Sequence, residues 1–195
     1  MLQYYMDQSN RIIENSYHGG NWTLDDQSLI DNSVVVANGA TPGSPLAAIS
    51  WKTNNTNTVY RQVFFIDGSG NVRETNTSTY NNTIGTQWTN PQIISSTDTA
   101  SSSSTVGLAA CIDLTSMNGI RVYYGTQAGY IEELAYQFNA SAQGWQYSYY
   151  FDQSDPNSGV ACSTYDDTTD ESIEYINVYV RSKSPILILA CCGDS

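Results

Sequence analysis

Short strand-like runs of apolar and aromatic residues alternate with polar, turn-forming segments along the whole chain. Runs of this length, bounded by Gly, Pro, Asn, Asp and Ser, are typical of β-strands. No long stretch places apolar residues at the three- to four-residue spacing of an amphipathic helix. The pattern therefore predicts an all-β protein.

One arrangement of strands and turns occurs three times. Each copy has an aromatic pair, a turn, an apolar-x-Glu triplet and, further on, a tryptophan. The pairs are Tyr4–Tyr5, Phe64–Phe65 and Tyr123–Tyr124, the glutamates are Glu14, Glu74 and Glu133, and the tryptophans are Trp22, Trp88 and Trp145. The glutamates lie about 60 residues apart. A strand-rich repeat of this length indicates a series of small sheets, as in a propeller or solenoid.

A run of small residues precedes the later aromatic strands. These runs are Leu46–Trp51, Leu108–Ile112 and Val160–Ser163. Their small side chains suit the crowded inner strands of neighbouring sheets. The expected order is a small inner strand, the aromatic strand, the glutamate strand and an outer strand, which is a four-stranded antiparallel propeller blade.

The repeats predict one propeller domain over residues 1–195 with about three to four blades. The units are expected at about 1–33 (partial), 34–104, 105–153 and 154–195 (partial). An array that starts and stops within a blade leaves unpaired strand edges. The propeller is therefore expected to be incomplete in this chain or closed by oligomerisation, with a homodimer as the simplest case.

Composition narrows the partners. The formal charge of −12 argues against nucleic acid and anionic membranes, and no apolar run approaches the roughly 20 residues of a membrane span. The first residues carry no signal-peptide pattern, so both a secreted and a cytoplasmic location stay open. Many Tyr, Asn, Ser and Thr residues favour a sugar-facing protein; five N-x-S/T sequons follow from the same composition.

Neither a cofactor nor a catalytic centre is expected. The four cysteines form no CxxC pair, and Cys111 and Cys162 are expected to be buried free thiols. The acidic run 166–171 lacks the glycine and ligand spacing of a calcium loop. His18 is the single histidine, and no nucleophile motif occurs. Repeated glutamates in equivalent places favour repeated binding over one asymmetric catalytic centre.

Two segments carry a resemblance to a known family. The run SPLAAISW at 44–51, and IRVYY at 120–124 followed by IEE at 131–133, resemble the fungal fucose-specific lectins of the orange-peel mushroom type. The resemblance covers nearly the whole chain. It implies a six-bladed propeller fold with fucose sites between neighbouring blades.

The resemblance also implies which residues would bind fucose. An Arg on the aromatic strand and a Glu on the next strand would hold the hydroxyls, while a Tyr and a Trp of the following blade would pack against the sugar. The Arg is present as Arg121, with Leu2, Gln62 and Asn177 in its place elsewhere. The Glu is Glu14, Glu74 and Glu133, the Tyr is Tyr17 and Tyr136 with Thr77 between them, and the Trp is Trp22, Trp88 and Trp145.

Pairing across neighbouring units gives no complete site. The fullest set is Gln62 and Glu74 with Tyr136 and Trp145. Arg121 with Glu133 is the best single pair for binding sugar hydroxyls, although the next unit supplies no matching aromatic residues. Glu14 faces Thr77 and Trp88, and Leu2 leaves it without an arginine.

The chemistry of a fucosylated glycan explains these residue types. Guanidinium donors and carboxylate acceptors bind vicinal hydroxyls, and flat aromatic rings contact the apolar side of the sugar. The aromatic pairs are as easily explained by core packing, and a tryptophan also serves as an outer-strand anchor. A structural or protein-interaction propeller with decayed sugar sites therefore remains the alternative, with a glycosidase as a third hypothesis.

Overall fold

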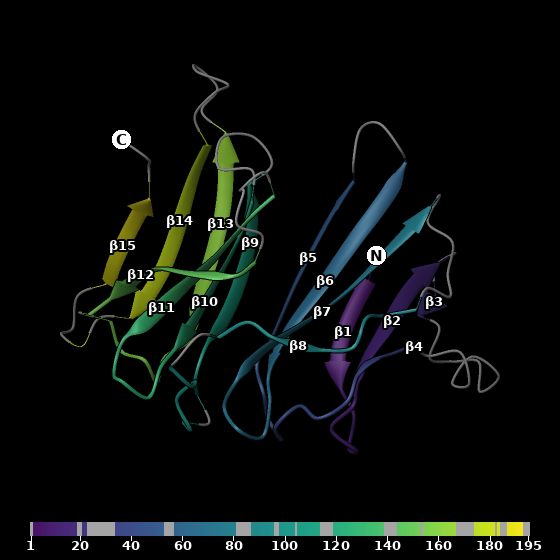
Figure 1. The fold of residues 1–195 in the computed structure, drawn as a ribbon, viewed down its shortest axis with the longest axis horizontal. Coiled ribbons are helices and arrows are strands. Elements are labelled where there is room, and N and C mark those ends of the chain that lie inside the picture. The colour runs from purple at the N-terminus through teal and green to yellow at the C-terminus, as the bar shows by residue number, and fades with distance from the viewer. Residues whose placement is uncertain are drawn as a thin grey trace. The chain divides into compact units, whose positions relative to one another are not determined.

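The computed structural model describes residues 2–18, 21–22, 34–52, 57–80, 87–95, 98–103, 105–113, 119–138, 144–152, 154–166, 174–181, 183 and 187–192. All regular elements in these ranges are β-strands (Figure 1). They are β1 (Leu2–Met6), β2 (Ile12–His18), β3 (Asn21–Trp22), β4 (Val34–Ala37), β5 (Leu46–Lys52), β6 (Thr58–Ile66), β7 (Val72–Tyr80), β8 (Gln92–Ile93), β9 (Leu108–Asp113), β10 (Gly119–Gly125), β11 (Ile131–Gln137), β12 (Gln146–Phe151), β13 (Val160–Asp166), β14 (Glu174–Arg181) and β15 (Leu187–Cys192). The prediction of an all-β protein is confirmed.

The chain forms two compact units. The first comprises residues 1–68 and 73–92, and the second comprises residues 69–72 and 93–195. The sheets β1–β4 and β5–β8 lie mainly in the first unit, and the sheets β9–β12 and β13–β15 lie in the second.

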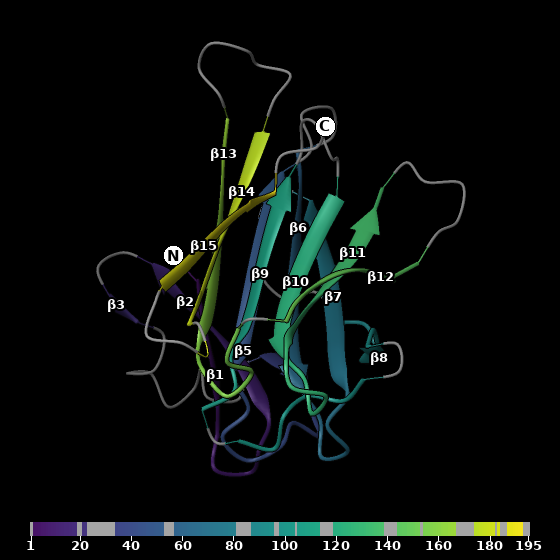
Figure 2. The same ribbon diagram turned by 90° about the vertical axis from the view of Figure 1, so that its left-hand side faces the viewer.

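The sheets have the predicted organisation of propeller blades. Strands β9, β10, β11 and β12 pair in chain order as one antiparallel sheet, and β5 to β8 repeat the order (Figure 2). The first sheet differs because both β3 and β4 pair with β2, and the described part of the last sheet has three strands. The prediction of four-stranded antiparallel blades is confirmed. The number of blades in the closed molecule and its closure by oligomerisation stay predictions.

Each aromatic strand turns sharply into its glutamate strand. The residue that permits each turn has a positive φ: Asn10 at 58°, Gly70 at 81° and Gly129 at 99°. Glycine reaches this region without a steric penalty, and asparagine is among the side chains that tolerate it. These turns set the register that places Glu14 opposite Tyr4 and Glu133 opposite Tyr123.

Each unit has its own apolar core between two sheets. In the first unit Ile12, Val36, Val63 and Phe65 pack together, with Tyr4 and Trp88 against them. In the second unit the core consists of Cys111, Tyr123, Ile131, Phe151, Ile176, Val178 and Val180. Each fully buried large side chain stabilises the fold by about 1.5–3 kcal/mol. Because the sheets pack through these faces, polar residues on the same faces are held between neighbouring blades of one unit.

Two predictions about single features can be compared with the described residues. Cys111 is a free, buried thiol, as predicted, whereas Cys162 is free but only partly buried. The described ranges include no helix that is long and apolar enough to cross a membrane.

Candidate functional site

Strand register fixes where the repeated glutamates lie. Tyr4 pairs with Glu14 across β1 and β2, and Tyr123 pairs with Glu133 across β10 and β11. Both tyrosines are held close to the carboxylates, and burial, followed by the charge of the adjacent glutamate, raises the pKa of each phenol above its ordinary value. The tyrosines therefore stay protonated and can act as hydrogen-bond donors.

Arg121 and Glu133 form a buried pair in the second unit. Arg121 Nε lies 3.7 Å from Glu133 Oε1, and the two side chains are 7% and 6% exposed. A second guanidinium nitrogen, Nη1, donates to the carbonyl oxygen of Ile120 at 3.2 Å. Removing charges from water is expensive unless they are compensated. The Nε–Oε1 separation exceeds ordinary hydrogen-bond length, so this pair is a loose one.

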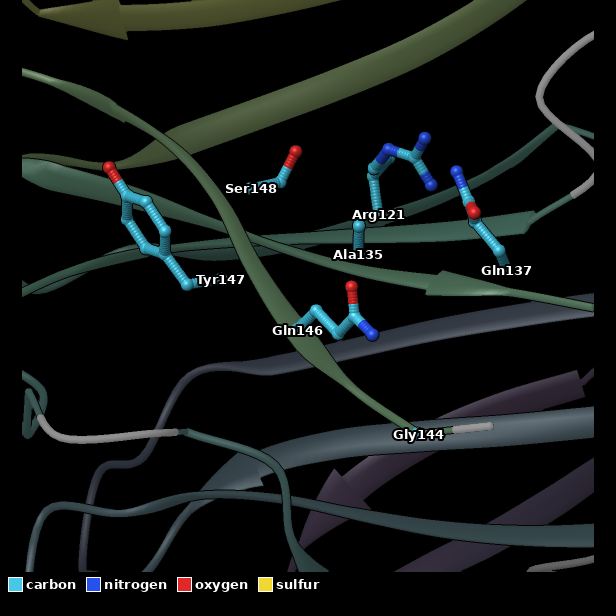
Figure 3. Close-up of a pocket in the computed structure, with 7 residues that line it drawn as sticks. All are labelled: Arg121, Ala135, Gln137, Gly144, Gln146, Tyr147 and Ser148. Carbon is cyan, nitrogen blue, oxygen red and sulfur yellow. The ribbon is translucent and has the colours of Figure 1, made fainter. Parts of the chain in front are cut away.

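A small cavity lies beside Arg121 (Figure 3). It has a volume of about 120 Å³ and is lined by Arg121, Ala135, Gln137, Gly144, Gln146, Tyr147 and Ser148. Register explains its position, because Arg121, Ala135 and Gln146 form one row across β10, β11 and β12. The methyl group of Ala135 leaves room between the two longer polar side chains. The cavity is therefore a feature of one sheet and requires no other element to define it.

The lining of this cavity suits an uncharged, hydroxyl-rich ligand. Figure 3 shows the polar ends of Arg121, Gln137 and Gln146 around one space, with Tyr147 at the far end of the group. A guanidinium donates only, whereas each amide both donates and accepts. The set can thus bind alternating donor and acceptor groups, as a polyol presents them. Sequence reasoning identified Arg121 but missed Gln137, Gln146 and Ser148, which no repeated motif marks.

The predicted set of Gln62, Glu74, Tyr136 and Trp145 is found as two halves. Gln62, which is buried, donates from Nε2 to Oε2 of Glu74 in the first unit. Tyr136 and Trp145 lie in the second unit with their ring centroids 5.6 Å apart. Each half is assembled within its own unit. The combined site stays a prediction.

Glu14 has the tightest contacts of the repeated glutamates. Arg61 Nη1 lies 3.0 Å from both carboxylate oxygens, and Tyr4 Oη donates to Oε2 at 2.8 Å. The guanidinium lies 6.0 Å from the centre of the Trp88 ring, which Tyr4 meets edge-on. Glu14 and Trp88, which the sequence paired, thus share one cluster. A cation over the face of a tryptophan is an attractive arrangement.

The expectation that Glu14 lacks an arginine is wrong, because Arg61 comes from a different strand. The sequence comparison looked for the arginine at Leu2, on the strand next to Glu14. Arg61 instead lies on β6, one residue before Gln62, so the two side chains point to opposite faces of their sheet. The alternation of side chains along β6 could have indicated this contact, because either Arg61 or Gln62 had to face the preceding blade.

The remaining predicted positions contribute less. The side chains of Tyr17 and Trp22 lie outside the described residues, although their backbones pair between β2 and β3. Thr77 is buried, and its hydroxyl donates to the carbonyl of Gln87 at 3.2 Å. This contact gives Thr77 a structural role. Among the described side chains, no group of three or more His, Cys, Asp or Glu residues is placed to hold a metal ion.

Among known proteins, the chain is similar to solved structures. No protein-family model and no curated protein matches the chain. A fucose lectin from Kordia zhangzhouensis, solved with methyl-fucoside, is 19% identical with a TM-score of 0.54 over 76% of this chain and 93% of that chain. A mutant of AofleA from Arthrobotrys oligospora is 13% identical with a TM-score of 0.59 over 98% and 52%. The BP39L lectin from Burkholderia pseudomallei is 15% identical with a TM-score of 0.53 over 95% and 51%.

These matches show a shared fold. Fucose lectins are among the solved structures of this fold, and they include Aleuria aurantia lectin, the orange-peel mushroom protein, at a TM-score of 0.39 that supports no further argument. The resemblance stated from the sequence is confirmed to that extent. The chain spans about half the length of the AofleA and BP39L chains.

Proposed function

We propose that the protein is a non-catalytic carbohydrate-binding protein, a lectin, that binds fucose or fucosylated glycans. The observation that carries the proposal is the cavity beside Arg121, where a buried guanidinium, two amides and a hydroxyl converge. Vicinal hydroxyls match planar donors and acceptors.

The loose geometry of the Arg121–Glu133 pair supports a ligand-binding role. Arg121 Nε lies 3.7 Å from Glu133 Oε1, beyond ordinary hydrogen-bond length. A sugar hydroxyl that accepts from Arg121 and donates to Glu133 can then bridge the two groups. A hydrogen bond to a charged group contributes about 1.5–3 kcal/mol, so the pair can account for ten- to a hundredfold in affinity.

Fucose is the proposed sugar because of the shared fold. The Kordia zhangzhouensis fucose lectin was solved with methyl-fucoside, and its identity to this chain is 19%. The residues that the resemblance assigns to fucose include Arg121, which lines this cavity, and Glu133, the buried partner of Arg121. The predicted set of Gln62, Glu74, Tyr136 and Trp145 belongs to the same proposal. Repetition of weak sites on one molecule raises the avidity for multivalent glycans.

A structural role is the second candidate, and the first unit favours it. Glu14 accepts from both Arg61 and Tyr4, and the Arg61 and Glu14 side chains are only 10% and 9% exposed. A carboxylate with these partners is satisfied without a sugar. The first unit can therefore use the repeated glutamate for architecture while the second unit uses it for binding.

Calorimetric titration of the protein with methyl-fucoside and with a fucosylated oligosaccharide tests the proposal. Gln146→Ala and Gln137→Ala remove cavity donors while they leave the Arg121–Glu133 pair in place. We expect each to weaken binding by about tenfold, the equivalent of one hydrogen bond. Gln92→Ala, an exposed glutamine on β8, is the matched control and keeps wild-type affinity. Folded wild-type protein that binds neither ligand would support the structural role instead.

The predicted homodimer requires a separate measurement. Light scattering at the concentration used for titration gives the mass in solution. A mass of two chains supports closure by a second copy, whereas a mass of one chain leaves the binding proposal intact and removes the dimer.

A further inference from the structure

An exposed strip of tyrosines runs along the outer strand β12. Tyr147, Tyr149 and Tyr150 are 47%, 55% and 49% exposed. Alternation alone would put Tyr147 and Tyr150 on opposite faces. The register shifts between Glu133 and Leu134, so Ser148 is an extra residue and both tyrosines come to one face.

The rings on that face form a group. Tyr150 lies 5.2 Å from Tyr130 and 6.4 Å from Tyr147, measured between ring centroids. Tyr149 pairs with Glu133 and therefore belongs to the other face, where its ring meets Phe151 at 5.1 Å. Exposed aromatic residues cost solvation free energy when they remain without a partner. Because the bulge brings exposed tyrosine rings together, we infer that this surface binds a ligand.

A buried carboxylate lies beneath these rings. Glu132 pairs with Tyr150 on β12 and with Tyr124 on β10, and it is 1% exposed. Its Oε1 has no hydrogen-bond partner among the described residues. A buried oxygen without a partner costs free energy that is recovered when a ligand supplies the missing donor or charge.

Among the described residues, no lysine or arginine forms an ion pair with the Glu132 carboxylate. All seven lysines and arginines lie within the described ranges. The carboxylates that pair with arginine there are Asp7, Glu14, Asp67 and Glu133. Glu132 is not among them. Arg121 belongs to the opposite face of the sheet, because Arg121 and Tyr124 are three residues apart on β10.

A second carboxylate adds negative charge at the same place. Tyr130 donates its hydroxyl to the Asp98 carboxylate, and Tyr124 donates to the Asp98 carbonyl at 2.8 Å. Burial, with the charge of Asp98 adding to it, raises the pKa of Glu132 to about 7, against a smaller opposing effect of the Tyr124 hydroxyl. Negative charge beneath exposed tyrosine faces is the combination that attracts an organic cation.

We propose that Tyr130, Tyr147 and Tyr150, with Asp98 and Glu132, form a binding site for an organic ammonium group. The ammonium lies against the ring faces and is neutralised by the carboxylates. Calcium is a poorer fit, since it needs six or more oxygen ligands and the rings occupy that space. The amine can be borne by an amino sugar or by a lysine side chain, and both present the same chemistry to the site.

Titration of a neutral and a charged ligand of the same shape tests this site. Glucosamine carries the ammonium and N-acetylglucosamine does not, while N-acetyl-lysine methylamide presents the amine on an alkyl chain. We expect glucosamine or the lysine derivative to bind, and whichever binds more tightly identifies the source. Tyr150→Ala should weaken that binding by about tenfold, in keeping with a cation–aromatic contact plus lost packing. Tyr179→Ala, at another exposed tyrosine, is the matched control.

The pH dependence of amine binding distinguishes this site from nonspecific binding. The groups that face Glu132 are Asp98, Tyr124, Tyr130, Tyr147 and Tyr150. Because burial raises the pKa of Glu132 to about 7, this carboxyl changes charge near neutrality. Binding of the lysine derivative, whose amine stays protonated through this range, should strengthen from pH 6 to pH 8, and Glu132→Gln should remove that change.

Several outcomes would overturn the proposal. They are N-acetylglucosamine binding as tightly as glucosamine, unchanged binding in Tyr150→Ala, and no binding of either amine to the folded wild type. The Glu132→Gln variant retains an uncharged, isosteric side chain, so loss of folding is not expected to obscure the result. None of these outcomes depends on the Arg121 cavity, because the methyl-fucoside titration is read independently.

Discussion

The two units hold the same pair of charged residues in different ways. In the first unit Arg61 reaches both oxygens of Glu14 at 3.0 Å, and Tyr4 and Trp88 surround the pair. In the second unit the Arg121–Glu133 separation is 3.7 Å. The arginine comes from β6 in one case and from β10, the strand beside the glutamate strand, in the other.

The difference lies in the residues around each pair. Aromatic rings fill the space around Arg61, whereas Ala135 and Gly144 leave a cavity beside Arg121. A repeated motif can therefore be closed into a structural contact or left open for a ligand by the size of its neighbours. Glu132 is the third case, a buried carboxylate without an arginine.

The largest expected effect is on the closed pair. Arg61→Met removes one partner of a buried ion pair and leaves Glu14 buried, which should lower the free energy of unfolding by about 3–5 kcal/mol. Urea denaturation measures the loss. Arg11→Met is the matched control because the Arg11 side chain is 49% exposed in its pair with Asp7, and it should cost far less than Arg61→Met. Equal losses in the two variants would contradict the distinction between buried and exposed pairs.

The next effect concerns the open pair. Ala135→Leu fills the cavity beside Arg121, so methyl-fucoside affinity should fall by at least about tenfold, the equivalent of one lost charged hydrogen bond. Calorimetry measures this affinity. Ala161→Leu, at an exposed position on β13, should bind as the wild type does. If Ala135→Leu binds methyl-fucoside as tightly as the wild type, the sugar does not bind in the cavity beside Arg121.

The carboxylate without an arginine should affect stability through pH. The pKa of Glu132 rises from an ordinary 4.5 to about 7 on folding, with burial as the main cause. The folded state therefore binds more protons than the unfolded state between these values, and stability falls as pH rises through that window. Urea midpoints between pH 4 and pH 8 should show a smaller fall in Glu132→Gln. Parallel profiles would show that Glu132 titrates normally.

The smallest effect tests the ring beside the closed pair. A double-mutant cycle of Trp88→Leu with Arg61→Met isolates the interaction between indole and guanidinium. We expect a coupling of about 0.5–2 kcal/mol, as for a partly desolvated cation over a ring. Additive losses of unfolding free energy would mean that the Trp88 ring, 6.0 Å from the Arg61 guanidinium, stabilises the fold through packing alone.

The sequence predicted the blades well because their signals are local. The aromatic pairs, the turns at Asn10, Gly70 and Gly129, and the small inner strands each depend on a few adjacent residues. The turn residues have the positive φ that such turns need. The all-β class and the order of strands within a blade followed from these features.

The site was less predictable because it depends on faces and neighbours. Arg61 lies one residue away from the family position, and only three-dimensional packing shows that it reaches Glu14. The cavity depends on the small size of Ala135, and the tyrosine cluster depends on a bulge at Ser148. None of these residues belongs to a repeated motif, so no comparison between repeats could reveal them.

A crystal structure of the protein soaked with methyl-fucoside would show whether the Arg121 cavity binds sugar. We expect sugar density in the cavity of the second unit, with hydroxyls within hydrogen-bond distance of Arg121 and Gln146. The closed pair of Glu14 and Arg61 should stay as it is in the same crystal. An empty cavity in a crystal whose other blades hold the sugar, or no bound sugar at saturating concentration, would contradict this expectation.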